Sequence, residues 1–138
     1  MEEHKSRILY WNGVYEYLND NPYTKNIDGI EIHATARFSE LLSRARRETF
    51  CLIAIHHNSE NTAYFAREIR KTKPQIPILA LTGAIEDTPY ERTLWKEGLN
   101  EEFGDGLFDD VISKAGSLDA DVYSIVYWLK RMTQGNLR

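Results

Sequence analysis

Two adjacent histidines, His56 and His57, follow the apolar stretch Cys51–Ile55. An imidazole can act as a base, a metal ligand or a phosphate acceptor, and α/β proteins often place such groups at the ends of buried strands. Adjacent strand residues point to opposite sides, so these two rings are not expected to share one metal ion. The other histidines, His4 and His33, lack the spacing of a zinc site. We therefore predict no metal site.

A catalytic role for His56 would require a nucleophile beside it. Ser59 and Thr82 are the only hydroxyl groups expected nearby, and neither stands in a nucleophile-elbow glycine pattern. The single cysteine, Cys51, lies inside an apolar run and is predicted to be a small buried hydrophobe rather than a reactive thiol. The sequence therefore predicts no catalytic residue, no enzymatic activity and no cofactor.

The elements that would position these residues follow from periodicity. Strands are predicted over 7–11, 30–35, 50–55, 76–82 and 110–114. The stretches 50–55 and 76–82 are nearly continuous apolar runs, which is typical of strands buried on both faces of a parallel sheet. The stretch 30–35 alternates more and is predicted to lie nearer an edge of the sheet.

Helical patterns separate the strands. Helices are predicted over 39–48, beginning on a capping Ser39, over 61–73, over 88–99 and over 117–134, with a short one over 14–19. Thr88 is expected to cap the third of these. In the last helix a single buried stripe is expected, made of Leu118, Val122, Ile125, Leu129 and Met132.

Alternating strands and helices predict a doubly wound α/β fold, in which functional loops gather at the carboxyl edge of the sheet. Seven residues are expected at that edge: Asn12, Gly13, His56, His57, Thr82, Gly83 and Lys114.

Two segments, "IPILALTGA" and "FDDVISKAGS", with the order and spacing of the elements, resemble the receiver domain of two-component response regulators. The resemblance covers roughly residues 7–133. It implies a flavodoxin-like (βα)5 fold: a doubly wound, five-stranded parallel sheet of strand order 2-1-3-4-5 in one domain, 1–138. It also implies that Thr82 and Lys114 correspond to the receiver hydroxyl and lysine.

The resemblance fails where a receiver performs its chemistry. A working receiver has a phosphate-accepting aspartate after its third strand and an acidic pair after its first strand that holds Mg²⁺. This sequence has His56, Asn12 and Gly13 there. Mg²⁺ requires hard, preferably anionic oxygen ligands, so it should not bind usefully. The resemblance thus implies a pseudo-receiver, whose vestigial phosphorylation pocket consists of Asn12, Gly13, His56, Thr82 and Lys114. His56 is expected to be mostly neutral beside Lys114 and to hydrogen-bond Asn12 or Thr82.

The sequence also departs from the receiver pattern in the last predicted strand and in the segment before it. Val111 and Ala115 replace the usual aromatic switch residue and proline. The segment "GLNEEFGDGLFDDV" is longer than the expected turn, and we predict that it is a solvated acidic loop rather than a cation site.

The composition excludes several classes of partner. The 138 residues carry a net charge of −4, which gives no argument for nucleic-acid binding. No apolar run approaches the roughly 20 residues of a membrane span, and the start has no signal-peptide pattern, so a cytoplasmic setting is expected.

We therefore predict a phosphorylation-independent interaction module in signalling that regulates a partner protein or an output domain. The surface of the fourth helix, fifth strand and fifth helix is expected to bind the partner or a second copy through aromatic residues, each of which could alternatively pad the flank of the core. These candidates are Tyr90, Trp95, Tyr123, Tyr127 and Trp128. The alternative is a small-ligand or anion sensor that uses the vestigial pocket.

Overall fold

The computed structural model describes residues 6–57, 59–83, 88–103 and 107–135. Six strands form one sheet in the order β2-β3-β1-β4-β5-β6. The strands are β1 (Ser6–Trp11), β2 (Tyr23–Ile27), β3 (Ile30–Thr35), β4 (Leu52–His56), β5 (Ile78–Thr82) and β6 (Asp110–Ser113). The helices are α1 (Phe38–Arg47), α2 (Ser59–Thr72), α3 (Pro89–Phe103) and α4 (Leu118–Gly135), with a 3-10 helix η1 (Glu16–Asn19) after β1.

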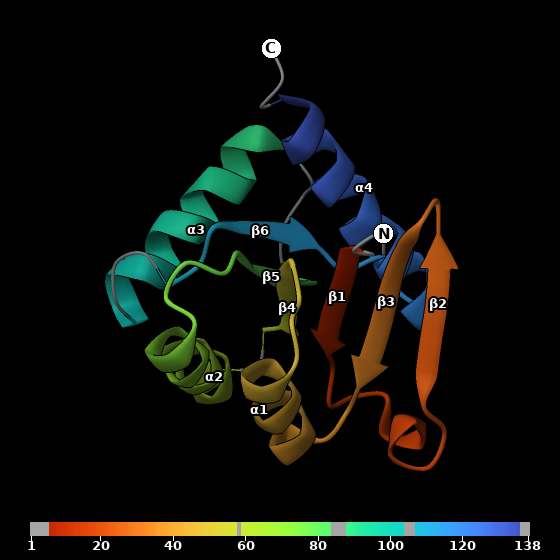
Figure 1. Ribbon diagram of the computed structural model, residues 1–138. Coiled ribbons are helices and arrows are strands. Elements are labelled where there is room, and N and C mark those ends of the chain that lie inside the picture. Colours follow the sequence, from red (N-terminus) through yellow and green to blue (C-terminus); the bar gives the residue numbers. More distant parts are fainter. Residues whose placement is uncertain (1–5, 58, 84–87, 104–106, 136–138) are drawn as a thin grey trace.

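The sheet is covered by helices on both faces (Figure 1). Helices α1, α2 and α3 pack on one face, where Ile53 and Ile55 of β4 meet Phe65 of α2. Helix α4 packs on the other face, where Leu52 and Ala54 of the same strand lie. Alternate residues of the central strands thus enter two separate cores, which explains why these strands read as continuous apolar runs.

The five predicted strands are confirmed as β1, β3, β4, β5 and β6. They pair in parallel, and their order is the predicted 2-1-3-4-5. The predicted helix 39–48 begins instead at Phe38 with Arg37 at its N-cap, so Ser39 lies in the first turn and does not cap it. The cap at Thr88 is confirmed, since its Oγ1 accepts the N–H of Glu91 at 3.2 Å.

Helix α3 continues to Phe103, beyond the predicted end at 99. The first part of the segment predicted to be an acidic loop is therefore helical. The side chain of Asn100 accepts the N–H of Phe108 at 3.1 Å and donates to its carbonyl at 3.4 Å, which ties this turn to the approach to β6. Residues 104–106 lie outside the described residues.

The first crossover differs from the prediction. Only the short η1 stands where a helix over 14–19 was expected, and the chain then forms the unpredicted strand β2, antiparallel to β3. Asp28 and Gly29 have positive φ angles of 52° and 84°, as in the tight turn that Asp-Gly favours in hairpins. The edge strand on this side is therefore β2, not β3.

No long helix connects β1 to β3. In the described part of the chain, α4 is therefore the one long helix on the second face of the sheet (Figure 1). Asp119 in its first turn accepts the hydroxyl of Tyr23 on β2 at 2.7 Å, and Lys130 near its end pairs with Asp28 in the β2–β3 turn. Met132 was predicted to be buried but is 45% exposed, and it lines a surface pocket with residues of α3 and Asp110 of β6. No helix in the described ranges is long and apolar enough to span a membrane.

Candidate functional site

The strand register aligns the residues at the carboxyl edge. Backbone hydrogen bonds continue one residue past the strands: Asn12 donates to Thr35 at 3.0 Å and Lys114 donates to Thr82 at 2.9 Å. His57 likewise donates to the Leu81 carbonyl at 2.7 Å. All seven residues predicted for this edge therefore lie along it, on β1, β4, β5 and β6 or directly after them.

Strand alternation divides these residues between the two faces of the sheet. His56 comes two residues after Ala54 and four after Leu52, so its side chain points to the same face of the sheet as theirs, the face that α4 covers. His57 lies on the other side, where its ring centroid is 6.2 Å from that of Trp95 on α3. The two histidines thus do not converge on one ligand.

Asn12 is almost fully buried, and its side chain is used in local structure. Its amide nitrogen donates to the Tyr10 hydroxyl at 2.9 Å, and its Oδ1 accepts the N–H of Val14 at 2.9 Å. Of the two partners expected for His56, Asn12 or Thr82, Asn12 makes no bond to it among the described residues, because the Asn12 amide serves Tyr10 and Val14 instead. Asn12 is consequently a structural residue of the β1–η1 turn.

The carboxylate nearest to this turn belongs to Asp121, in the first turns of α4, and it is fully buried. Its Oδ1 accepts the N–H of Ala115 at 2.7 Å, and its Oδ2 accepts the hydroxyls of Tyr10 at 3.0 Å and Tyr15 at 3.3 Å. We call Tyr10, Asn12, Tyr15 and Asp121 the Asp121 network. It fixes α4 to the end of β1 and to the chain following Lys114.

The Asp121 network also raises the pKa values of its two tyrosines. Burial, and then the neighbouring Asp121 carboxylate, raises the pKa of Tyr15 to about 12 and that of Tyr10 still further. Both hydroxyls therefore remain protonated donors at neutral pH. The sequence analysis missed this network, although Asp121 stands four residues before Ile125, at the spacing of the buried stripe.

Gly13 lies against the indole of Trp11. A Cβ atom there would be 3.0 Å from the Trp11 ring, closer than ordinary side-chain contacts. The indole is held from its other end, because its Nε1 donates to the Ala36 carbonyl at 3.2 Å. An acidic side chain at position 13 would therefore require the tryptophan to move.

His56 is partly buried and has a low pKa. Burial and then the charge of Lys114 lower its pKa to about 4. Its Nδ1 has no hydrogen-bond partner among the described residues. The ring is thus neutral at pH 7. In the described part of the chain no three histidine, cysteine or acidic side chains are grouped to hold a metal ion.

Four of the five aromatic residues predicted for an interface are at least partly accessible. Tyr90, Tyr123 and Tyr127 are 72%, 51% and 63% exposed, and Trp95 is partly buried. Trp128 takes the alternative role that was considered for each of these aromatics, that of core padding. It is only 4% exposed, and its Nε1 donates to Oδ2 of Asp110 on β6 at 2.7 Å, so it belongs to the core under α4.

The exposed aromatics belong to different parts of the surface. Tyr123 lies toward β2, where Lys25 Nζ is 5.0 Å from the centre of its ring. Tyr90 and Trp95 are on α3, across the sheet from α4 (Figure 1). The two helices nevertheless meet at the β6 edge, where Pro89, Thr93 and Lys96 of α3 line one pocket with Met132 of α4, so the face predicted from the resemblance includes both helices.

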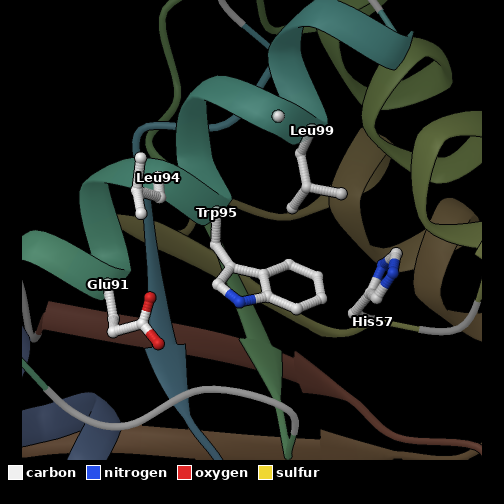
Figure 2. Close-up of a pocket in the computed structure, with 6 residues that line it drawn as sticks. His57, Glu91, Leu94, Trp95 and Leu99 are labelled. Carbon is white, nitrogen blue, oxygen red and sulfur yellow. The ribbon is translucent and has the colours of Figure 1, made fainter.

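A groove of about 360 Å³ lies between α3 and the end of β4 (Figure 2). Its described lining consists of His57, Glu91, Leu94, Trp95, Gly98 and Leu99. The sequence analysis did not find this groove, since its shape depends on how α3 packs beside His57.

The fold has counterparts among solved structures, although no protein-family model and no curated protein matches the chain. A CheY-like response regulator receiver domain protein from Methanospirillum hungatei JF-1 is 18% identical, with a TM-score of 0.58 over 96% of this chain and 99% of that one. The receiver domain of the Francisella response regulator 1452 is 17% identical, with a TM-score of 0.52 over 92% and 98% of the two chains. The fold is that of a receiver domain.

In this receiver fold, the Asp121 network occupies the turn after the first strand. Thr82 and Lys114 stand at the ends of β5 and β6, as the resemblance implied. Asn12, Gly13 and His56 stand at the ends of β1 and β4. The receiver fold is therefore complete in its parallel strands. The buried Asp121 lies beside the end of β1, and Glu91 of α3 lines the groove beside the end of β4.

The low pKa of His56 predicts an acid-sensitive contribution to stability. The folded state binds this proton less readily than the unfolded chain, whose histidine pKa is near 6.5. Stability should therefore fall as the pH is lowered from about 6.5 toward 4. We expect a loss of about 1–2 kcal/mol, less than the full shift implies because the ring is partly exposed.

Urea unfolding at pH 7.5 and pH 5 measures this loss in the wild type and in His56→Gln. The variant should lose less stability between the two pH values. A His56 ring signal that titrates near pH 6.5 in NMR would contradict the prediction.

Proposed function

We propose that this domain is a receiver-like signalling module that works without phosphoryl transfer and regulates its partner by direct binding. The receiver fold supports the signalling class, and the chemistry of the carboxyl edge supports independence from phosphate. The observation that carries the proposal is the state of Asn12, whose amide is buried and bonded within the Asp121 network.

Phosphoryl transfer to a receiver requires a nucleophilic carboxylate and a metal ion that neutralises the phosphoryl oxygens. His56 replaces the carboxylate, and Asn12 and Gly13 replace the metal ligands. Asp121 is a poor substitute, because each of its oxygens already accepts hydrogen bonds and its side chain is not exposed. An acidic residue at position 13 would also require Trp11 to move.

The solvent side of α4 is the surface that we assign to binding. Tyr123 and Tyr127 are exposed one turn apart, with Arg131 5.1 Å from the centre of the Tyr127 ring. Tyrosine beside arginine or lysine is a favoured composition for the anchors of an interface. Because this surface is one side of the helix α4, it needs no conformational change at the carboxyl edge of the sheet in order to form.

A titration with Mg²⁺ followed by NMR tests the proposal. We expect no saturable shift of the backbone signals of Asn12, Gly13 and His56 up to about 20 mM Mg²⁺, because the site lacks anionic oxygen ligands. Saturable shifts confined to these residues at lower concentrations would contradict it.

The second candidate function is an anion sensor at the same edge. It is supported by the buried Nδ1 of His56, which lacks a described partner, and by the charge of Lys114 within electrostatic range. A lasting rise in melting temperature with inorganic phosphate or nucleotides, abolished by Lys114→Gln, would favour the sensor over the interaction module.

A further inference from the structure

The groove between α3 and β4 combines one carboxylate with apolar and aromatic walls. Leu94, Trp95 and Leu99 supply the apolar surface, and Glu91 supplies the charge. Figure 2 shows Glu91 and Trp95 extending from α3 in the same direction, with His57 beyond the six-membered end of the indole. The groove therefore has an anionic end beside an aromatic ring.

Glu91 stands in the first turn of α3, three residues after the Thr88 cap, where a negative charge is favourable to the helix dipole. Only its backbone N–H takes part in the helix cap at Thr88, and its partly buried carboxylate has no ion pair or hydrogen bond within the described residues. Two other partly buried carboxylates, those of Glu48 and Glu31, pair with arginine and histidine. A partly buried carboxylate without a partner is available to a cation from outside.

We propose that this groove binds a small organic cation, an ammonium or guanidinium group on a short apolar or aromatic stem. The cation would lie over the Trp95 ring, beside the Glu91 carboxylate, where charge attraction and the ring quadrupole act together. The stem would contact Leu94 and Leu99. The volume of about 360 Å³ suits a molecule of this size.

The site is independent of the proposed signalling function. It lies on the α1–α3 side of the sheet, whereas the Asp121 network and the exposed tyrosines of α4 lie on the other side. Failure of the cation proposal would thus leave the phosphate-independent role untouched.

The indole N–H signals in NMR provide a direct readout, since the chain has three tryptophans. Those of Trp11 and Trp128 donate to Ala36 and Asp110 in the core and serve as internal references. The probes are phenethylammonium chloride, phenylacetate and phenethyl alcohol, which share a stem and differ in charge. We expect phenethylammonium to shift the Trp95 signal with saturation, and the other two to bind at least about fivefold more weakly.

Variants assign the shift to the groove. Glu91→Gln should weaken phenethylammonium binding about fivefold, while Glu97→Gln, which removes the same charge from an exposed position of α3, should leave it within about twofold. Gly98→Leu should abolish binding without unfolding, because a Cβ atom at this helical position meets no atom within 4 Å and position 98 lines the groove, which the rest of the leucine side chain would occupy. Equal shifts by all three probes, no shift of Trp95, or unchanged binding in Glu91→Gln would overturn the proposal.

Discussion

Asp121→Ala is expected to destabilise the domain by about 3 kcal/mol, because it leaves the fully buried hydroxyl of Tyr10 and the N–H of Ala115 without their acceptor. Tyr15 should contribute less, since it is partly exposed and its hydroxyl can turn toward water. Asp121→Asn should cost less than alanine, because the amide keeps one oxygen for the Ala115 N–H. Urea unfolding measures all of these losses.

Asp119→Ala is the matched control. It removes the same charge from the same turn of α4, but the Asp119 side chain is 65% exposed and its bonds to Tyr23 and Lys25 lie at the surface. We expect a much smaller change in the midpoint of unfolding than for Asp121→Ala. Equal losses in the two variants would show that the network contributes only helix-terminus electrostatics, contrary to our account.

Trp128→Ala is expected to cost about 3–5 kcal/mol and to lower the melting temperature by roughly 10 °C or more, as for other large-to-small changes in a core. The indole is only 4% exposed, and its loss would leave a cavity under α4 and Asp110 without a donor. Trp128→Phe retains most of the volume, so it should cost less.

The neighbouring substitution Tyr127→Ala shows by comparison whether Trp128 acts in the core or in an interface. Tyr127 is 63% exposed, so its replacement should change stability little. If the domain associates through α4, sedimentation velocity should show that Tyr127→Ala weakens the association. An unchanged melting temperature in Trp128→Ala together with lost self-association would show that Trp128 is an interface residue after all.

The parallel strands could be predicted because their sequences carry a strong signal. β4 and β5 are buried on both faces, and a run such as Leu52–Ile55 has few alternatives to a central strand. β2 was missed because Tyr23–Ile27 includes Lys25 and Asn26, which are poor strand formers. The Asp28-Gly29 turn after it was the available signal.

The positions at the carboxyl edge could also be predicted, since they follow from where each strand ends. The contacts of these residues could not. Asp121 in the first turn of a helix has an ordinary explanation in the helix dipole, so its burial against Tyr10 was not anticipated. Trp128 lies three residues after Ile125, on the flank of the apolar stripe, and only the packing of α4 near β6 shows that this flank is buried.

The groove beside His57 illustrates the same limit. Glu91, Trp95 and Gly98 recur at helical spacing, which predicts a shared side of α3 but not what that side faces. The outcome depends on tertiary packing that brings α3 beside the end of β4.

The most direct test of the central claim is incubation of the domain with acetyl phosphate and Mg²⁺, followed by intact-mass spectrometry beside a receiver domain that does become phosphorylated. We predict no gain of about 80 Da, the mass of one phosphoryl group, while the control domain gains it. A gain of this size in the domain, mapped to His56 or Asp121 and lost in His56→Gln or Asp121→Asn, would contradict the account.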